Sequence, residues 1–465
     1  MQRKKHLLTF ILTAVFMFSF SMSFNAAARE WDLTLPSLKE VFADYFPIGN
    51  ILEPNEIADG RTTDMFLHHY NFLTAENAMK PVNIARTPGE WDFGMRRLDL
   101  MVDWALENDV QVVGHTLVWH SQSAPWLTGD EDGNPLTRAE ARDNMERYIN
   151  AVAGHFAGRI YSWDVVNEAL LTSVGAPPPV VEEGWWKDVL RTEKGERDSS
   201  PWYAAYANGM DEEAGEHPSD YIYDAFVFTR IADPNAILYY NDFNETSAGK
   251  REAMAQMTEE LNARWLGDPR NDAPGRLLVE GLGMQAHYWT ADLNPINVEM
   301  TILRFAQTGA IISITELDIP MGRYGGFEAA TEENLRKQAD LYRDVFEVLM
   351  RHADKIERVT LWGKADPQSW RSEGSPLLFN GSFEAKDSFT NIVALAQGPQ
   401  IPVAPDAEIP DDDNDDPVTE VAVPSFAGAE AQEETNDSGI PWKINAIACG
   451  AVLLLAGIIL LNVRK

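Results

Sequence analysis

The sequence predicts an α/β fold, a (β/α)₈ TIM barrel, in its central part. Between residues 30 and 397, short β-rich runs alternate with longer helical patterns, and eight such runs can be distinguished. This alternation is typical of parallel βα units, and eight of these units close a barrel. The runs also end in polar side chains, which a barrel gathers at its C-terminal face, where the active sites of this fold lie.

The eight predicted strands are runs rich in apolar, β-branched and aromatic residues. They comprise Phe46–Leu52, Asn71–Glu76, Val110–Trp119, Ile160–Glu168, Ala236–Asn244, Val279–His287, Ile311–Asp318 and Arg358–Trp362. Amphipathic stretches separate them, among them Gly94–Glu107 and Leu335–Met350, whose apolar residues recur at helical spacing. We expect the barrel and its loops to form one domain, residues 29–400.

Seven of these runs end in side chains suited to chemistry. The endings are Thr74-Ala75-Glu76-Asn77, Trp119-His120-Ser121-Gln122, Asn167-Glu168, Asn241-Asp242, Gln285-Ala286-His287, Glu316-Leu317-Asp318 and Trp362. A carboxylate directly after a buried strand is costly unless it is paired or hydrogen-bonded. One such ending could be structural, but seven together predict a functional site at the mouth of the barrel.

The N-terminus is typical of a signal peptide, predicted to comprise residues 1–28. A basic segment, residues 3–5, precedes the apolar run Leu7–Phe24, and small residues up to Ala28 form a cleavage site. An uncleaved anchor is the alternative, but the small residues favour cleavage. The sequence therefore predicts that the protein is exported.

The C-terminal end is predicted to comprise an acidic, disordered linker, residues 401–442, and a transmembrane anchor, residues 443–465. The cluster Asp411–Asp416 lacks the central glycine and terminal glutamate of an EF-hand, which favours a solvated linker over a calcium loop. Ile444–Val463 is almost entirely apolar and long enough to cross a bilayer, and two basic residues follow it. These charges predict an extracellular protein held at the cell surface. A buried core helix and a sorting signal that is later removed are the alternatives.

Charge and composition narrow the possible partners. The formal net charge is −34 at pH 7, which argues against DNA or RNA, since phosphate binding needs clustered Lys and Arg. Cys449 is the single cysteine, so no disulfide is predicted within the chain. The sequence has no phosphate loop, zinc-ligand cluster or dinucleotide motif. We therefore expect a monomer that needs no cofactor and no metal.

Seven motifs, taken in chain order, resemble those of one enzyme family. They are TAENAMKP (74–81), GHTLVWHSQ (114–122), WDVVNE (163–168), YNDFN (240–244), GLGMQAH (281–287), ITELDI (314–319), and Trp362 followed by SWR (369–371). Together they resemble the signatures of glycoside hydrolase family 10, the endo-β-1,4-xylanases, over residues 40–397. The resemblance implies hydrolysis of internal β-1,4-xylosidic bonds of xylan, with retention, through a covalent glycosyl-enzyme.

The resemblance also implies that Glu168 is the acid/base and Glu316 the nucleophile. Glycoside hydrolysis needs one carboxylic acid to protonate the leaving oxygen and one carboxylate on the other side of the sugar. Glu168 ends the fourth predicted strand and Glu316 the seventh, so they can face each other across the barrel mouth. Glu168 must then be protonated and Glu316 ionised. A salt bridge on the barrel rim is the structural alternative for each.

Substrate-binding residues follow from the same resemblance. Asn167 is similar to the asparagine that binds the sugar 2-hydroxyl, and His287 to the histidine that orients the nucleophile, with Asn241 and Gln285 in the same network. The others resemble donor-side subsites or the tryptophans that roof them. They are Glu76, Asn77, Lys80, His115, Trp119, Gln122, Trp362 and Trp370. A core role is the alternative for the tryptophans, most of all for Trp370, and also for His287.

Two features depart from the family pattern. Phe243 occupies a position where the family usually has Tyr, so one hydroxyl is missing. Ser173–Glu196 looks like an insertion directly after the acid/base strand and should border the acceptor subsites. Within it, Trp185 and Trp186 can stack on xylose units or pack inward on a small helix, and inward packing is favoured.

Two other functions compete with that of a xylanase. A barrel glycosidase that cleaves β-glucan or mannan would have the same strand layout. Lys80, His115 and Gln122, however, resemble residues that crowd the space of a hexose hydroxymethyl group. A non-catalytic carbohydrate-binding protein would lack a catalytic carboxylate, and both are present.

Overall fold

The computed structural model describes residues 30–399, apart from 95–96 and 193–197. The predicted signal peptide (1–28), linker (401–442) and anchor (443–465) lie outside these residues. Within the part that the structure describes, no helix is both long enough and apolar enough to cross a membrane.

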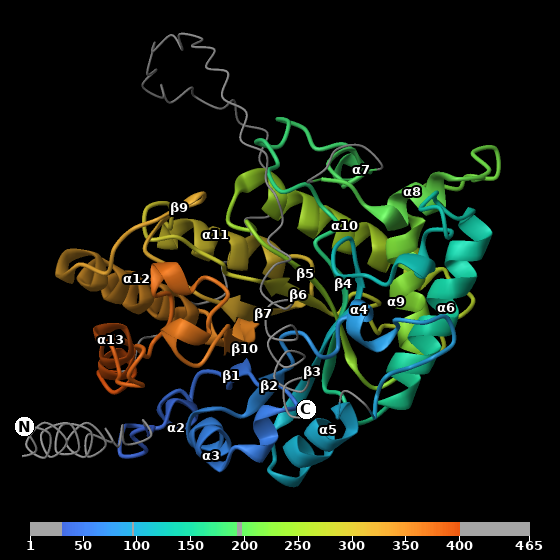
Figure 1. Cartoon of the computed structure of the whole chain (residues 1–465). Helices are drawn as coiled ribbons and strands as arrows, with labels where there is room; N and C mark the ends of the chain where they lie inside the picture. Colours follow the sequence, from blue (N-terminus) through green and yellow to red (C-terminus); the bar gives the residue numbers. More distant parts are fainter. Residues whose placement is uncertain (1–29, 95–96, 193–197, 400–465) are drawn as a thin grey trace, which may run out of the picture. The chain divides into compact units, whose positions relative to one another are not determined.

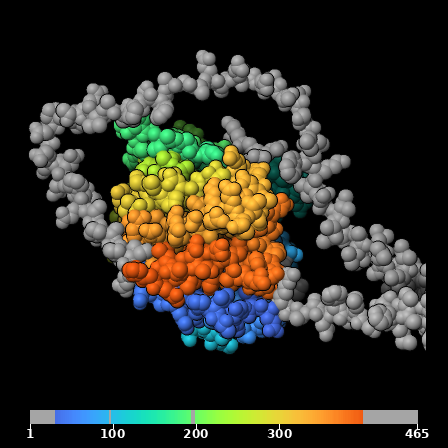
Figure 2. Space-filling view, turned by 90° about the vertical axis from the view of Figure 1, so that its left-hand side faces the viewer, coloured from blue at the N-terminus to red at the C-terminus, as the bar shows by residue number. Residues whose placement is uncertain are grey.

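Eight parallel strands form the closed barrel that the sequence predicts (Figure 1). They are β1 (Ile48–Ile51), β2 (Phe72–Thr74), β3 (Gln111–Trp119), β4 (Ser162–Asn167), β5 (Ile237–Asp242), β6 (Gly281–Met284), β7 (Ile311–Leu317) and β10 (Ile356–Leu361). β1 pairs with β10, which closes the barrel. Accordingly, Figure 2 shows the blue surface of the first described residues next to the orange surface of residues late in the barrel sequence.

Helices lie around the strands, and at least one of ten residues or more follows each barrel strand (Figure 1). These helices are α3 (Gly60–His69), α5 (Leu98–Glu107), α6 (Arg138–His155), α9 (Asp220–Ala232), α10 (Ala248–Leu266), α11 (Pro295–Ala306), α12 (Glu332–Arg351) and α13 (Asp387–Ala396). Short helices complete the loops: α2 (Leu38–Val41), α4 (Pro81–Ile84), α7 (Trp185–Asp188) and α8 (Pro201–Ala207). A hairpin of β8 (Gly322–Arg323) and β9 (Gly326–Phe327) follows β7.

Local sequence signals account for several element ends. Thr137 caps α6 and forms a capping box with Glu140, so two orphan backbone donors are satisfied reciprocally. Seven of the predicted strand ranges contain the observed strand, whereas β10 begins at Ile356, two residues before the predicted start at Arg358. The predicted ranges overhang the observed strands at both ends. At the carboxyl ends, the polar endings leave the hydrogen-bonded ladder and form the mouth of the barrel.

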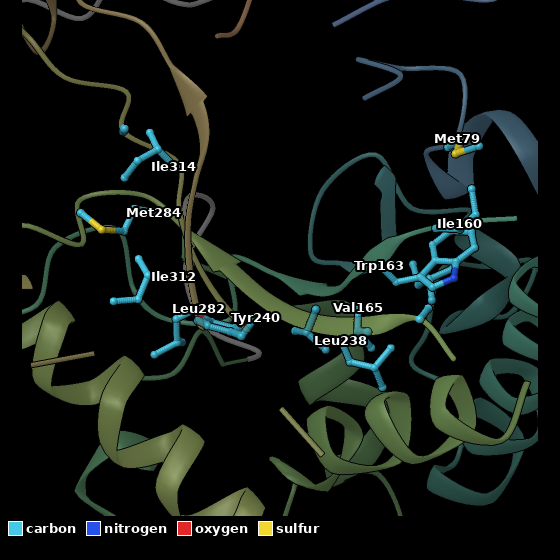
Figure 3. Close-up of a cluster of buried hydrophobic side chains, with 14 of the residues drawn as sticks. Met79, Ile160, Trp163, Val165, Leu238, Tyr240, Leu282, Met284, Ile312 and Ile314 are labelled. Atoms are coloured by element: carbon cyan, nitrogen blue, oxygen red, sulfur yellow. The ribbon is translucent and has the colours of Figure 1, made fainter. Parts of the chain in front are cut away.

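Successive side chains of a strand point to opposite faces of the sheet, so one set packs in the core and the other lies on the side of the site. Leu282 and Met284 of β6 pair in register with Ile312 and Ile314 of β7, and Figure 3 shows these four among the buried apolar side chains. Gly283 lies between the two β6 residues, so it faces the other side of the pleat. A Cβ at Gly283 would lie 2.3 Å from the side-chain oxygen of Asn241. Glycine is therefore needed there, and the space it leaves is occupied by a side chain of the site.

Candidate active site

The carboxyl ends of the strands surround a cleft of about 760 Å³. All predicted site residues except Asn241 line this cleft. They are Glu76, Asn77, Lys80, His115, Trp119, Gln122, Asn167, Glu168, Gln285, His287, Glu316, Trp362 and Trp370. Asn241 is fully buried and contacts two of them. The fold thus brings together every residue that the motifs singled out.

Glu316 is held by two hydrogen-bond donors near the end of β7. Nδ2 of Asn241 donates to its Oε1 at 2.8 Å, and Nε2 of His287 contacts its Oε2 at 3.1 Å. Burial opposes ionisation of this carboxyl, but the hydrogen bond from His287 and the nearby ring of His115 outweigh it. The pKa of Glu316 therefore lies below its ordinary value of 4.5. An ionised carboxylate held in this way can attack an electrophilic carbon.

His287 is itself held by Asp318 on its other side. Nδ1 of His287 lies 3.0 Å from Oδ1 of Asp318, which is fully buried and also accepts hydrogen bonds from Arg371 and Trp370. Burial disfavours the imidazolium. The attraction of Asp318 and the hydrogen bonds to Asp318 and Glu316 nevertheless raise the pKa of His287 to about 9. At neutral pH both ring nitrogens of His287 therefore donate, and the ring connects Asp318 to Glu316.

Glu168 is the first residue after β4, and its backbone is left-handed, with φ of 56°. Its Oε1 accepts hydrogen bonds from Gln285 at 3.1 Å and from Asn167 at 3.3 Å. Burial raises the pKa of the Glu168 carboxyl, and the negative charges of Asp242 and Glu316 raise it further, to above the ordinary 4.5. A carboxyl group that holds its proton in this way can act as a general acid.

Three amide side chains connect the two carboxyl groups. Besides their bonds to Glu168 and Glu316, Gln285 and Asn241 both donate to Oδ1 of Asn167, at 3.1 and 3.0 Å. A continuous set of hydrogen bonds therefore runs from one carboxyl group to the other. Because each member is fixed by the next, the two groups are held in one geometry before any substrate binds.

Lys80, Asn77 and Trp119 form a polar and aromatic part of the cleft wall. Nζ of Lys80 donates to Oδ1 of Asn77 at 3.0 Å and lies 5.2 Å from the ring centre of Trp119. Burial lowers the pKa of Lys80, although the surrounding carboxylates oppose that shift, and burial raises the pKa of Glu76 nearby. These groups can offer hydrogen bonds and an apolar ring face to a sugar.

The two tryptophans differ in exposure. Trp362 is 4% exposed and packs edge-on against His115, with ring centres 5.4 Å apart. Trp370 is 61% exposed and packs edge-on against His287 at 5.1 Å. Its exposure excludes a core role, which the sequence left open for Trp370. Trp362 is packed into the protein and still borders the cleft.

Three aromatic residues that belong to none of the seven motifs also line the cleft: Trp289, Tyr324 and Phe327. The ring centres of Trp289 and Phe327 are 5.3 Å apart, and the guanidinium carbon of Arg371 lies 4.1 Å from the ring centre of Trp289. Tyr324 lies beside them and is 67% exposed. Tyr324 and Phe327 belong to the hairpin after β7. Aromatic residues in a loop that directly follows a predicted strand end are the signal that could have identified them.

His120 is a further neighbour of the site. It belongs to the motif GHTLVWHSQ (114–122), but the resemblance implies no role for it. Its Nδ1 lies 3.9 Å from Oε2 of Glu168. Burial, with the positive charges of Arg191 and Lys250, lowers the pKa of His120 to about 3. The ring is therefore neutral over most of the pH range and adds no positive charge beside Glu168.

The structure shows where Phe243 and the two tryptophans of the predicted insertion lie relative to the cleft. Phe243 lines the cleft, and Nζ of Lys250 lies 4.5 Å from its ring centre. In the predicted insertion, Trp186 is 2% exposed and donates through Nε1 to Glu260 at 2.7 Å. Trp185 is half-buried, and neither tryptophan lines the cleft. Inward packing on a small helix, α7, is thus confirmed.

We expect kcat/KM to follow a bell-shaped pH profile. It should fall at low pH as Glu316 takes up a proton, below pH 4.5 because its pKa is lowered. It should fall at high pH as Glu168 loses its proton, above pH 4.5 because its pKa is raised. In Asp242→Asn one charge that raises the pKa of Glu168 is gone, so the alkaline limb should move to lower pH.

Initial rates on xylan, the substrate that the family resemblance leads us to expect, measure both limbs across pH. The exposed Asp272 gives the control, since Asp272→Asn removes the same charge in the loop between α10 and β6, which leads to the amino end of a strand, whereas Glu168 follows the carboxyl end of β4. An alkaline limb that stays in place in Asp242→Asn, or moves equally in both variants, would contradict the assignment.

The chain is similar to known proteins over most of its length. The model of the family described as Glycosyl hydrolase family 10 matches residues 37–395. The beta-1,4-xylanase of Dictyoglomus thermophilum is 32% identical over 394 residues, which cover 82% of this chain and 97% of that protein. The endo-1,4-beta-xylanase A of Thermotoga maritima is 33% identical over 377 residues, or 79% of this chain. The match spans only 31% of the Thermotoga protein, which is about three times as long as the shared region.

Solved structures agree with the sequence relatives. A GH10 xylanase from termite gut that contains a bacterial Ig-like domain is 34% identical, with a TM-score of 0.67 and 79% of each chain covered. A xylanase of Thermoanaerobacterium saccharolyticum, solved as a variant with xylotriose, is 30% identical. Its TM-score is 0.63, and 77% of this chain and 98% of that chain are covered.

Proposed function

The chain belongs to glycosyl hydrolase family 10, and on that premise we propose that it is a retaining endo-1,4-β-xylanase (EC 3.2.1.8). It hydrolyses internal β-1,4-xylosidic bonds of xylan. The observation that carries the proposal is the pair of carboxyl groups at the ends of β4 and β7, whose pKa values are shifted in opposite directions. Opposite shifts in one cleft are what a general acid and a nucleophile require.

The reaction proceeds in two steps. Glu316 attacks the anomeric carbon while Glu168 donates its proton to the departing sugar oxygen, and a covalent glycosyl-enzyme forms. Glu168, now ionised, then removes a proton from water, which attacks the same carbon and releases Glu316. His287 holds the Glu316 carboxylate through Nε2, and Asn241 holds its other oxygen. These two donors orient the carboxylate toward the sugar and keep it ionised.

Xylan is favoured over other glycans as the substrate. The relatives named above are described as xylanases, and one structural neighbour was solved with xylotriose. In this chain, Lys80, His115 and Gln122 line the cleft together. They occupy the wall that, by the family resemblance, leaves no room for a hexose hydroxymethyl group. The donor-side role of Glu76, Asn77 and the two tryptophans belongs to the same proposal.

The experiment that tests the function compares reducing-sugar release from xylan, β-glucan and mannan. We expect release from xylan as a series of oligosaccharides, because an endo-acting cleft opens at both ends, and little release from the hexose polymers. Activity confined to mannan or glucan would refute the substrate, and release of xylose alone would refute internal cleavage.

We further propose that the protein is exported and held at the cell surface. The basic segment and apolar run that precede Ala28, and the apolar run Ile444–Val463 with the two basic residues after it, support this. In the native host, the mature protein should begin at Arg29 and leave the membrane fraction only in detergent. A soluble chain that still begins at Met1 would contradict the proposal.

A further inference from the structure

The backbone of Glu168 adopts a conformation that needs support from its surroundings. Its φ of 56° lies in the left-handed region, which non-glycine residues rarely occupy. Gln122, Asn244 and Ala286, which follow β3, β5 and β6, have similar positive φ values. Such conformations persist only where neighbouring groups hold them. The direction in which the Glu168 carboxyl points therefore depends on what holds its main chain.

Arg191 is one group that holds it. Nε of Arg191 donates to the backbone carbonyl oxygen of Glu168 at 2.9 Å, and the side chain is almost completely buried. Its Nη1 donates to Asp198 at 2.9 Å and its Nη2 to Oγ1 of Thr172 at 3.2 Å. The backbone amide of Arg191 also donates to the carbonyl of Ala169 at 2.9 Å. A buried guanidinium with this many partners has a fixed position, and its bond to the carbonyl is charge-assisted.

The segment that carries Arg191 is attached to α10 along its length. Nζ of Lys250 donates to the carbonyl of Leu171 at 3.0 Å. A Cβ at Gly249 would lie within 1.8 Å of the carbonyl oxygen of Gly175, so the two backbones are in close contact. Farther along, Glu260 accepts hydrogen bonds from the amide of Gly184 and from Nε1 of Trp186. The described part of this segment, up to Thr192, thus rests on a barrel helix and gives Arg191 a rigid support.

We propose that Arg191 is a positioning residue for the acid/base. The segment from Ala169 to Thr192 leaves Glu168, packs on α10 and returns, so that Arg191 fixes the carbonyl of Glu168 and thereby the direction of its carboxyl. This inference rests on the proposed function and explains what the insertion contributes to it. Proton transfer needs the acid within hydrogen-bond reach of the leaving oxygen, and a displacement of about 1 Å can cost 100-fold in rate.

The test compares two substrates that differ in their need for an acid. The leaving sugar of xylohexaose must be protonated, whereas dinitrophenolate leaves dinitrophenyl β-xylobioside without a proton. For Arg191→Met we expect kcat/KM on xylohexaose to fall by about 100-fold, and kcat/KM on the aryl substrate to stay within about twofold of the original protein. Arg191→Lys keeps the positive charge and an N–H donor group but not the planar fork of the guanidinium, and should recover part of the loss.

A second readout follows the later step. Dinitrophenyl xylobioside forms the glycosyl-enzyme readily, and its hydrolysis then needs Glu168 as a base. Azide needs no base: it attacks the anomeric carbon, displaces the Glu316 carboxylate and gives a β-xylobiosyl azide. Azide should therefore raise kcat of Arg191→Met on the aryl substrate and leave that of the original protein almost unchanged.

Arg230→Met is the matched control. Arg230 is also buried, donates to the carbonyl of Ala236 at 2.9 Å and pairs with Glu280, but at the amino end of β5. It should lower the melting temperature without changing the ratio of the two kcat/KM values. If Arg191→Met does not fold, Asp198→Ala removes one partner that orients Arg191 and should shift the same ratio in the same direction.

An equal fall on both substrates, or an unchanged ratio, would overturn the positioning role. Failure of the original protein to cleave either substrate would instead refute the proposed function, so the two failures can be told apart.

Discussion

Replacing Glu316 with alanine is expected to lower kcat/KM on xylan by at least about 10⁴-fold, the scale on which enzymes lose activity with their nucleophile. Without the carboxylate no glycosyl-enzyme can form. Glu316→Gln should lose as much, although the amide keeps the size of the side chain. The shared loss, with melting temperatures near that of the original protein, would assign the effect to the missing nucleophile rather than to packing around His287 and Asn241.

Stereochemistry makes this prediction sharper. In Glu316→Ala, azide can enter the space that the carboxylate leaves and attack dinitrophenyl β-xylobioside from that side. The product should be an α-xylobiosyl azide, with inverted configuration. Residual xylanase activity within about tenfold of the original, or a β-azide as the only product, would show that another residue is the nucleophile.

Replacing Glu168 with alanine is expected to lower kcat/KM on xylan by about 10²–10⁴-fold, the usual contribution of general acid catalysis. The effect on dinitrophenyl β-xylobioside should be much smaller, because its leaving group needs no proton. The alkaline limb of the pH profile should also disappear, because the group with the raised pKa is gone.

Azide provides the control for Glu168→Ala as well. It should accelerate turnover of the aryl substrate and give the β-azide, opposite in configuration to the product of Glu316→Ala. Equal losses on xylan and the aryl substrate, or no response to azide, would contradict the acid/base role. Together the two variants assign each carboxylate to one face of the sugar.

Much of the fold could be predicted because its signals are local in the chain. The eight strands appear as short apolar runs bounded by polar endings, and each predicted run overlaps its observed strand. The boundaries differ at both ends, and the largest difference is at β6, which stops at Met284 while the predicted run continues to His287. The hydrophobic pattern continues into residues that face the cleft, and only pairing with a neighbouring strand decides where the ladder ends.

The site residues could be predicted only where a motif contains them. Asn167, Gln285 and His287 belong to motifs and take part in the hydrogen-bond network. Tyr324 and Trp289 line the same cleft but belong to none of the seven motifs, and the only signal for them is an aromatic residue in a loop after a predicted strand. Loops carry little periodicity, so their contribution to a cleft depends on where the barrel places them.

By itself, the sequence determined the barrel and the family, and it singled out Glu168 and Glu316 as the candidate catalytic pair, because these follow from residue type, spacing and order along the chain. Only the tertiary structure decided that the pKa of Glu168 is raised and that of Glu316 lowered. It alone also showed Arg191 holding the backbone of Glu168. The physical reason is that burial, charge proximity and hydrogen bonding depend on distances between residues far apart in the chain, and closure of the barrel sets those distances.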